Sequence, residues 1–430
     1  MRASDAKLQS FLEPIASSAV TAELARRLAE QRHVAATGQW GACALVLAAA
    51  VQRTLGRPML ILTAHLDDAD DAVDQLHFFY PGASVRLYPA FEVLPGESNL
   101  SHELASQRLE LLVDLAAEQG RRGEGERGEG GADFIVAPIQ ALLQPSPNRA
   151  LLTDLVLSIK SGDTVDRDTL VRWLADHGYT RLDAVEDAGD FAVRGDIVDF
   201  WSPSAGEGGS YPTRINLFGD QVESVHHFDL ESLGPTGNIE EARIVALGDR
   251  STWPIEKTTS LLSYLPEETI VWLIEPGEVQ EQAKSYFDRL EDARGIYPPS
   301  AVLRNIQQFA WAEIHQFGAE DESTLRLPCK SIQRFDTKAE EAIRELAELA
   351  ERAKVVVICD SASERGRLSD LLDVKHPGSR AKIEMPVGVI TLGFEWDEGE
   401  KPEARSQKKN IGKMPMLRNI GGTPMPRPRC

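Results

Sequence analysis

Residues 191–201 read FAVRGDIVDFW, a run of strand-forming residues interrupted by one arginine and one glycine. Apolar side chains occupy odd positions before the glycine and even positions after it: Phe191, Val193, Val198 and Phe200. Because side chains alternate between the two faces of a strand, this change of parity predicts a bulge or kink at Gly195 that re-aims the strand. Arg194 would lie at that kink, where a purely structural strand requires no charge.

The sequence around this run predicts a small antiparallel sheet backed by a helix. Downstream, the runs Thr213–Phe218 and Gln221–Phe228 are separated by a Gly-Asp pair, which is typical of a two-residue hairpin turn. Upstream, a strand over 151–159 precedes a helix with Asp166 as its N-cap and Gly178 as its end. We therefore expect a small sheet that presents cationic side chains.

The composition is that of a soluble protein with two to four domains. The chain has 430 residues, of which 42% are hydrophobic and 26% charged, and its formal net charge is −21. A surface this acidic repels phosphate unless basic residues gather locally, so we do not expect unaided tight binding to duplex DNA.

Cysteine spacing and hydropathy favour a cytoplasmic location. Cys43, Cys329, Cys359 and Cys430 lie far apart, which suits reduced thiols better than a disulfide framework or a zinc site. No run approaches 18 consecutive apolar residues, and the N-terminus lacks a basic region followed by an apolar one. We expect no contact with a membrane.

Strands and helices alternate both before and after the small sheet. His33–Ala36, Met59–Thr63 and Asp133–Ala137 have the pattern of buried strands separated by helices, which implies a parallel sheet covered on both faces. The alternation resumes at Thr269–Ile274, so we expect the chain to return to the first core.

The predicted fold class is α/β, with several units. A degenerate P-loop-type parallel-sheet domain carries an inserted small antiparallel α+β domain, and a second small α/β domain and a disordered basic tail follow. The tail is rich in Lys, Arg and Pro and has no periodic apolar face. The expected boundaries are residues 15–148 for the first part of the parallel-sheet domain, 149–236 for the inserted domain, 237–328 for the return, 329–395 for the third domain and 396–430 for the tail.

A loop in the position of a phosphate loop follows the first predicted strand. It contains Thr37, Gly38 and Gly41, but it lacks the Lys that reaches the phosphates and has no complete Gly-rich spacing. We expect a plain strand-to-helix turn without competent binding of ATP and magnesium. A residual nucleotide site around Gly38 and Gly41 is the alternative.

No pattern in the sequence indicates catalysis or metal binding. His226 and His227 are adjacent, but neighbours on a strand face opposite sides and cannot readily share a metal. Asp196 and Asp199 could be imagined as an acid and a base, but carboxylates in a strand are usually solvated or paired with Arg. We therefore expect no catalytic residues, no metal and no cofactor in this chain.

Several segments resemble one family of repair proteins. Val193–Phe200, Arg214–Ser224 and Phe228–Asp229 resemble the damage-handover domain that the excinuclease B protein shares with the transcription-repair coupling factor. Leu87–Leu112 and Ile332–Leu372 are similar to the coupling factor in particular. The residues alone leave Leu87–Leu112 open between a ligand-binding loop and a well-packed crossover. The resemblance spans about residues 15–395, and the degenerate loop favours the coupling factor over the excinuclease B protein.

The resemblance implies a site for the excinuclease A subunit in residues 149–236. Arg181 and Arg194 match the arginines of that contact, whereas Ala192 stands where the excinuclease B protein often has a further Arg. Phe200 and Trp201 are neighbouring apolar candidates for the same contact. The chain would then recruit the excinuclease A subunit to stalled transcription complexes and catalyse nothing itself.

The resemblance also implies parts that are not expected in these 430 residues. The family binds RNA polymerase and duplex DNA, and hydrolyses ATP with magnesium, through later domains. The basic tail begins where the third domain should continue, which predicts a truncation or a frameshift. Two alternatives are a residual ATP-dependent DNA helicase or translocase, and a truncated product without function.

Overall fold

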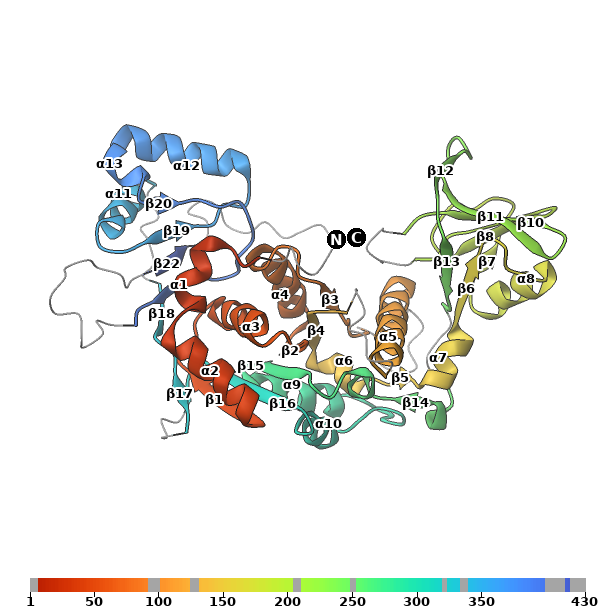
Figure 1. Ribbon diagram of the computed structural model, residues 1–430, viewed down its shortest axis with the longest axis horizontal. Coiled ribbons are helices and arrows are strands. Elements are labelled where there is room, and N and C mark those ends of the chain that lie inside the picture. The colour runs from red at the N-terminus through yellow and green to blue at the C-terminus, as the bar shows by residue number, and fades with distance from the viewer. Residues whose placement is uncertain are drawn as a thin grey trace.

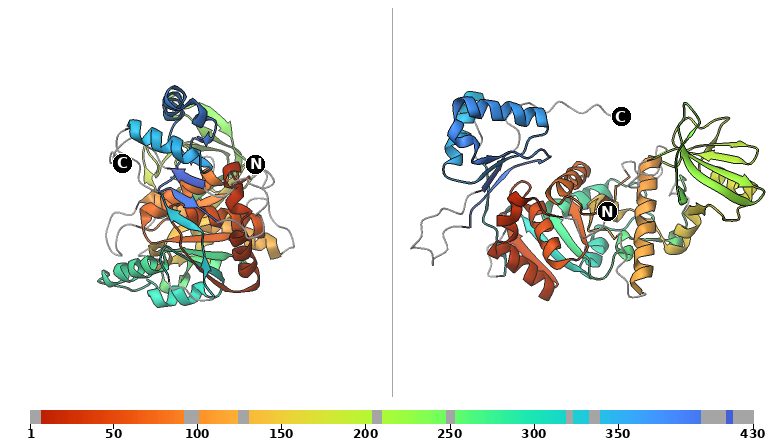
Figure 2. Two further views of the ribbon diagram at one scale, coloured as in Figure 1. Left: turned by 90° about the vertical axis from the view of Figure 1, so that its left-hand side faces the viewer. Right: turned by 45° about the horizontal axis from the view of Figure 1, so that its top comes forward.

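The computed structural model describes residues 7–91, 101–123, 131–203, 210–247, 253–318, 323–332, 339–398 and 414–417. These residues form a central unit built on a parallel sheet and two smaller units (Figure 1). The right-hand view of Figure 2 shows the two smaller units at opposite ends of the central one.

The central unit contains a seven-stranded sheet in which every pair of neighbouring strands is parallel. Its strands come from residues 33–138 and 270–326, so two distant stretches of the chain share one sheet. The predicted parallel sheet is confirmed. In order across the sheet, the strands are β17 (Leu325–Arg326), β1 (His33–Thr37), β16 (Ala310–His315), β15 (Ile270–Ile274), β2 (Met59–Thr63), β4 (Phe134–Pro138) and β3 (Val85–Leu87).

Helices cover both faces of this sheet, because its strands are apolar on both sides. Met59 and Ile61 of β2 belong to one core cluster, whereas Leu60 and Leu62 belong to another. The helices of the first cluster are η2 (Ser10–Leu12), α1 (Glu13–Ala16), α2 (Ala19–Glu30), α3 (Cys43–Leu55) and α4 (Leu66–Phe79). Those of the second are α5 (His102–Gly123), α6 (Ile139–Leu143), α7 (Arg149–Leu155), η5 (Leu261–Tyr264), α9 (Pro276–Asp288) and α10 (Pro299–Ile306).

One small unit is a six-stranded sheet with a helix against one face. Leu170 and Leu174 of α8 (Arg167–Asp176) pack with Phe191 and Val198 of the sheet. Asp166 caps this helix, since its carboxylate accepts the N–H of Thr169 at 2.9 Å, as predicted. In order, the strands are β12 (Pro235–Asn238), β11 (Gln221–Phe228), β10 (Thr213–Phe218), β9 (Ile197–Phe200), β8 (Asp190–Arg194) and β7 (Thr180–Arg181).

Gly195 lies in a hairpin turn, and the predicted bulge or kink within one strand is wrong. β8 and β9 are antiparallel, with Arg194 opposite Ile197 and Val193 opposite Val198. A turn of Gly195 and Asp196 reverses the chain, so Phe191 and Phe200 face the same side despite their different parity. Gly195 has a φ of 61°, which a first central glycine adopts in a two-residue hairpin. The predicted hairpin at Gly219 and Asp220 is confirmed by the pairing of Phe218 with Gln221.

A two-stranded ribbon connects this unit to the central one (Figure 1). β6 (Val156–Lys160) pairs with β13 (Glu241–Val245) in antiparallel register. The predicted strand over 151–159 is wrong in its first half, because residues up to Leu155 belong to α7. Asn148 caps that helix, because its side chain accepts the N–H of Leu151 at 2.9 Å. This local hydrogen bond favours a helix over the strand that the apolar residues predicted. Near this ribbon, β5 (Ser146–Pro147) pairs with β14 (Thr258–Thr259), and η4 (Ile255–Lys257) precedes β14.

The other small unit is a five-stranded mixed sheet with helices. Its strands, in order, are β18 (Cys329–Ser331), β21 (Phe394–Trp396), β22 (Met414–Leu417), β19 (Val355–Val357) and β20 (Ile383–Glu384), and its helices are α11 (Ala339–Ala350), α12 (Ala362–Lys375) and α13 (Pro377–Arg380). The predicted disorder of the tail is wrong for β22, which pairs with both β19 and β21. The other residues of 399–430 lie outside the described part of the chain. Among the described helices, none is long and apolar enough to cross a membrane.

Candidate functional site

The two arginines singled out in the sequence lie at one edge of the six-stranded sheet. β7 is the edge strand and runs parallel to β8, with Arg181 opposite Phe191. The guanidinium of Arg194 reaches the loop that follows β7, where its Nη2 donates to the carbonyl of Asp183 at 3.0 Å. Asp183 is two residues beyond Arg181, so the fold brings both arginines to the same edge.

Neither arginine has a carboxylate partner within the described residues. Arg181 is exposed and makes no side-chain hydrogen bond or ion pair there. Arg194 is also exposed and donates only to the carbonyl of Asp183, through Nε at 3.3 Å and Nη2 at 3.0 Å. Both guanidinium groups are thus available to carboxylates of another molecule, which they would bind by charge-assisted hydrogen bonds.

A third arginine of the same sheet is already neutralised. Arg214 of β10 forms a bidentate pair with Asp199 of β9, through Nε at 2.6 Å and Nη2 at 2.9 Å. The side chain of Asp199 is 5% exposed, and the Arg214 guanidinium stacks on the ring of Phe228 at 4.7 Å. The Asp199 carboxylate holds the pKa of Arg214 above its usual value. The two charges of this pair compensate each other within the sheet, which leaves little charge for a partner.

The two apolar candidates differ in their availability. Phe200 is 1% exposed and lies in the core against α8, so its predicted direct contact with a partner is incompatible with this conformation. Trp201 is half-buried on Val185, Ala192 and Phe228, and its Nε1 donates to Ser210 Oγ at 2.6 Å. Trp201 therefore positions the edge of the sheet, and part of its ring remains accessible.

The segment 87–112, which the residues alone leave open between a ligand-binding loop and a crossover, is well packed where the structure describes it. The guanidinium of Arg108 is fully buried between the rings of Tyr88 and Phe91, at 4.3 and 4.5 Å from their centroids. Arg108 also donates to Tyr88 Oη at 2.7 Å and to Gln144 Oε1 at 2.8 Å. Burial lowers the pKa of Arg108. These contacts favour the structural alternative over a ligand-binding loop, while residues 92–100 lie outside the described ranges.

The loop after β1 is closed by carbonyl groups of the protein itself. The N–H groups of Gly38 and Gln39 donate to the carbonyl of His315 at 3.0 and 3.1 Å. The N–H of Ala42 donates to the carbonyl of Leu392, in the third unit, at 3.0 Å. A phosphate group would need these same donors to be free.

The unit with the five-stranded sheet closely approaches this loop at Gly41. Gly41 has a φ of 52°, and a Cβ on it would lie 2.4 Å from the carbonyl oxygen of Leu392. Thr37, which the sequence assigned to the loop, is the last residue of β1 and is 7% exposed. Nearby, Gly388 faces Phe78 of α4, where an added Cβ would lie 2.1 Å from a ring carbon. The loop is therefore a docking point between two units.

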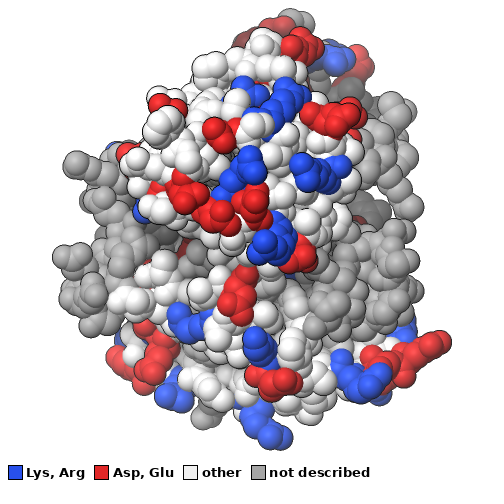
Figure 3. All heavy atoms as spheres, turned by 90° about the vertical axis from the view of Figure 1, so that its right-hand side faces the viewer, with Lys and Arg blue, Asp and Glu red and all other residues white. Residues whose placement is uncertain are grey.

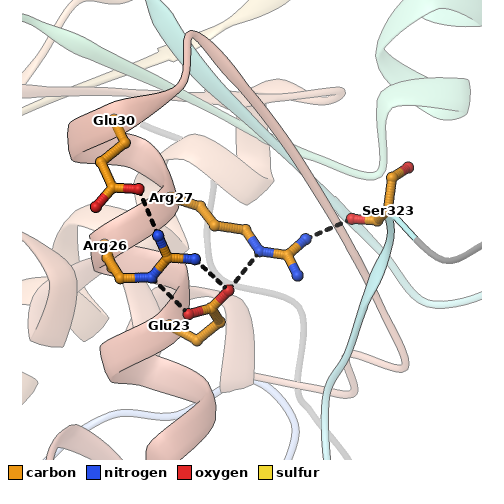
Figure 4. Close-up of polar contacts among 5 residues, drawn as sticks. All are labelled: Glu23, Arg26, Arg27, Glu30 and Ser323. Carbon is orange, nitrogen blue, oxygen red and sulfur yellow. Dashed lines mark hydrogen bonds and ion pairs between the residues drawn. The ribbon is translucent and has the colours of Figure 1, made fainter.

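A pocket beside β1 is another candidate binding site. It is lined by Arg26, Arg27, Gln31, His33, Val34, Ala35 and Ser323. Figure 4 shows that Glu23 accepts hydrogen bonds from Arg26 and from Arg27, that Glu30 also binds Arg26, and that the carbonyl of Ser323 accepts from Arg27. The two arginines bring no net charge to this pocket once Glu23 and Glu30 are counted, so it offers little attraction for an anion.

The described residues contain no cluster of three or more His, Cys, Asp or Glu that could hold a metal ion. His226 and His227 have different neighbours, and His227 Nδ1 lies 3.1 Å from Thr213 Oγ1. Burial lowers the pKa of both imidazoles, and the positive charge of Arg214 lowers the pKa of His226 further. They are structural residues of β11.

The end of the molecule that carries the six-stranded sheet has a mixed surface. Figure 3 shows Lys and Arg side chains interspersed with Asp and Glu, without a continuous basic patch on this face. Phosphate backbones are bound by gathered positive charge. The two exposed arginines at the sheet edge can instead form charge-assisted hydrogen bonds with carboxylates.

Comparison with known proteins defines this module more closely. Residues 157–248 match the family described as the UvrB interaction domain. The matched residues include the six-stranded sheet, α8 and most of the ribbon of β6 and β13.

The longer similarity is to transcription-repair-coupling factors. The protein of that name from Myxococcus xanthus is 25% identical over 73% of this chain and 28% of its own length. Those from Bacillus subtilis and Staphylococcus aureus strain USA300 are 30% and 28% identical over 45% and 49% of this chain. This chain spans 28% or less of the length of these three relatives.

The sequence contains some signal for the Asp199–Arg214 ion pair and none for the contact of Leu392 with the loop. The ion pair of Asp199 with Arg214 has only a general signal, since carboxylates in a strand are often paired with Arg, and the register of β9 against β10 decides which Arg is the partner. The carbonyl of Leu392 that closes the loop at Gly41 has no such signal, because backbone carbonyls are common to all residues and the two positions lie far apart in the chain.

Proposed function

We propose that this chain is a binding module of transcription-coupled nucleotide excision repair, which recruits the excinuclease A subunit to stalled transcription complexes. The observation that carries the proposal is the UvrB interaction domain with Arg181 and Arg194 exposed at one sheet edge without carboxylate partners among the described residues. The similarity to transcription-repair-coupling factors supports the process.

The two arginines act as electrostatic anchors in this proposal. A carboxylate of the partner that binds a guanidinium is desolvated in the interface, and truncating one member of such a pair costs roughly 2–5 kcal/mol. Arg194 is held in place by the carbonyl of Asp183, so less side-chain entropy is lost when it binds.

The test measures how tightly the purified chain binds the cognate excinuclease A subunit. Arg181→Ala and Arg194→Ala should each weaken the affinity, and the double variant should weaken it further, with the melting temperature nearly unchanged. Arg172→Ala is the matched control, because Arg172 is an exposed arginine of α8 in the same domain. Undiminished binding by the double variant would refute the site.

We further propose that the chain performs no ATP-driven step. A residual helicase or translocase would need free N–H donors around Gly38 and Gly41, and carbonyls of His315 and Leu392 already accept those of Gly38, Gln39 and Ala42. The absence of a Lys in the loop supports the same conclusion.

A further inference from the structure

Among the described residues, α8 covers one face of the six-stranded sheet and no helix covers the other. Phe191, Val198, Phe200 and Ile215 point toward α8. The residues between them point to the opposite face, which we call the open face. Arg194 is on the open face, because it lies three positions after Phe191 on β8.

A row of side chains crosses the open face through four strands. Arg194 is opposite Ile197, Ile197 is opposite Asn216, and Asn216 is opposite Ser224. Arg194 is exposed and the other three are half-buried. Asn216 Nδ2 donates to Ser224 Oγ at 2.8 Å, so no charge other than that of Arg194 belongs to this row.

Phe218 extends this row at the end of β10. It lies two residues beyond Asn216, and therefore on the same face, and its side chain is 79% exposed. From strand spacing and rise, its Cα lies about 12 Å from that of Arg194. An exposed Phe and an exposed Arg on one face of a sheet are residue types that are enriched at protein–protein interfaces.

The position of Phe218 is fixed by the backbone. Phe218 pairs with Gln221 across the turn at Gly219, whose φ is 60°. A neighbouring loop holds the same hairpin, because the N–H of Val165 donates to the carbonyl of Asp220 at 2.7 Å. The backbone that carries the ring is thus held at a defined place before binding.

We infer that the open face from Arg194 to Phe218 is one docking surface for the excinuclease A subunit, with Phe218 entering an apolar pocket beside a carboxylate that binds Arg194. The charges support this occupant: Arg194 has no acidic partner among the described residues, so a protein that supplies a carboxylate complements the row. The inference rests on the proposed function and adds a second anchor, about 12 Å from the first by strand geometry.

The test compares Phe218→Ala with Phe317→Ala in the full chain, by titration with the excinuclease A subunit. Phe317 is the matched control, because it is 75% exposed but lies after β16 in the central unit. Phe218→Ala should weaken binding about tenfold, as expected for an aromatic anchor, and Phe317→Ala should leave it unchanged. Equal melting temperatures for both variants establish that folding is retained.

The outcomes separate this inference from the proposed function. If Arg194→Ala weakens binding and Phe218→Ala does not, the arginine site stands and the extended surface is overturned. Equal losses in Phe218→Ala and Phe317→Ala would also overturn it, since the effect would not be specific to the open face. Absence of binding by the unaltered chain would overturn both.

Discussion

Asp199→Asn should destabilise the unit with the six-stranded sheet, because it removes the charge that neutralises Arg214. The carboxylate is 5% exposed and accepts two hydrogen bonds from one guanidinium, at 2.6 and 2.9 Å. Breaking a buried ion pair by changing one partner costs about 3–5 kcal/mol. The Arg214 side chain is 15% exposed and can turn partly toward water, so we expect the low end, about 3 kcal/mol.

Hydrogen exchange measured by mass spectrometry is the suitable assay, because the chain has several units and its global unfolding need not be a single transition. A loss of about 3 kcal/mol accelerates exchange of the amides in β9 and β10 by about two orders of magnitude where they open with the domain. Amides of β2 and β15 in the central sheet serve as the internal reference and should not change.

A double-mutant cycle tests whether the loss of stability comes from the ion pair between Asp199 and Arg214. Arg214→Met alone should cost at least as much as Asp199→Asn, because it leaves the more deeply buried carboxylate without a partner. The combination should cost less than the sum of the two single changes, since neither ion then remains unpaired. Additive losses, or protection in β9 and β10 unaltered by Asp199→Asn, would refute the assignment of this pair as a stabilising contact.

Two further predictions concern protonation and nucleotide binding. Burial lowers the pKa of His226 and His227 from 6.5, so the unfolded state binds more protons than the folded state. The domain should therefore lose stability as the pH falls below about 6.5, before carboxylates titrate. Amide protection in β11 that is equal at pH 7.5 and pH 5.5 would contradict this prediction. Because the donors at Gly38, Gln39 and Ala42 are occupied, calorimetric titration with ATP and magnesium should show no saturable binding; a micromolar dissociation constant would count against the closed loop.

Periodicity in the sequence was sufficient to predict the two kinds of sheet. Continuous apolar runs such as Met59–Thr63 indicated parallel strands buried on both faces, and residues of that strand do contribute to both core clusters. Local signals also predicted the cap at Asp166 and the hairpin at Gly219, because both depend on neighbours in the chain. The change of parity at Gly195 was real, but a turn and a bulge produce the same pattern, and only strand pairing distinguishes them.

The sequence by itself determined which residue types are present at the candidate site and how the strands that carry them alternate. Only the tertiary structure decided which arginine is neutralised. Arg214 on β10 pairs with the carboxylate of Asp199 on the neighbouring strand β9, whereas Arg194 donates to the carbonyl of Asp183. It also decided that Phe200 is buried, that Phe218 is exposed, and that Leu392 closes the loop at Gly41. The physical reason is that burial and ion pairing depend on the surroundings in space, whereas a local pattern specifies only the direction in which a side chain points.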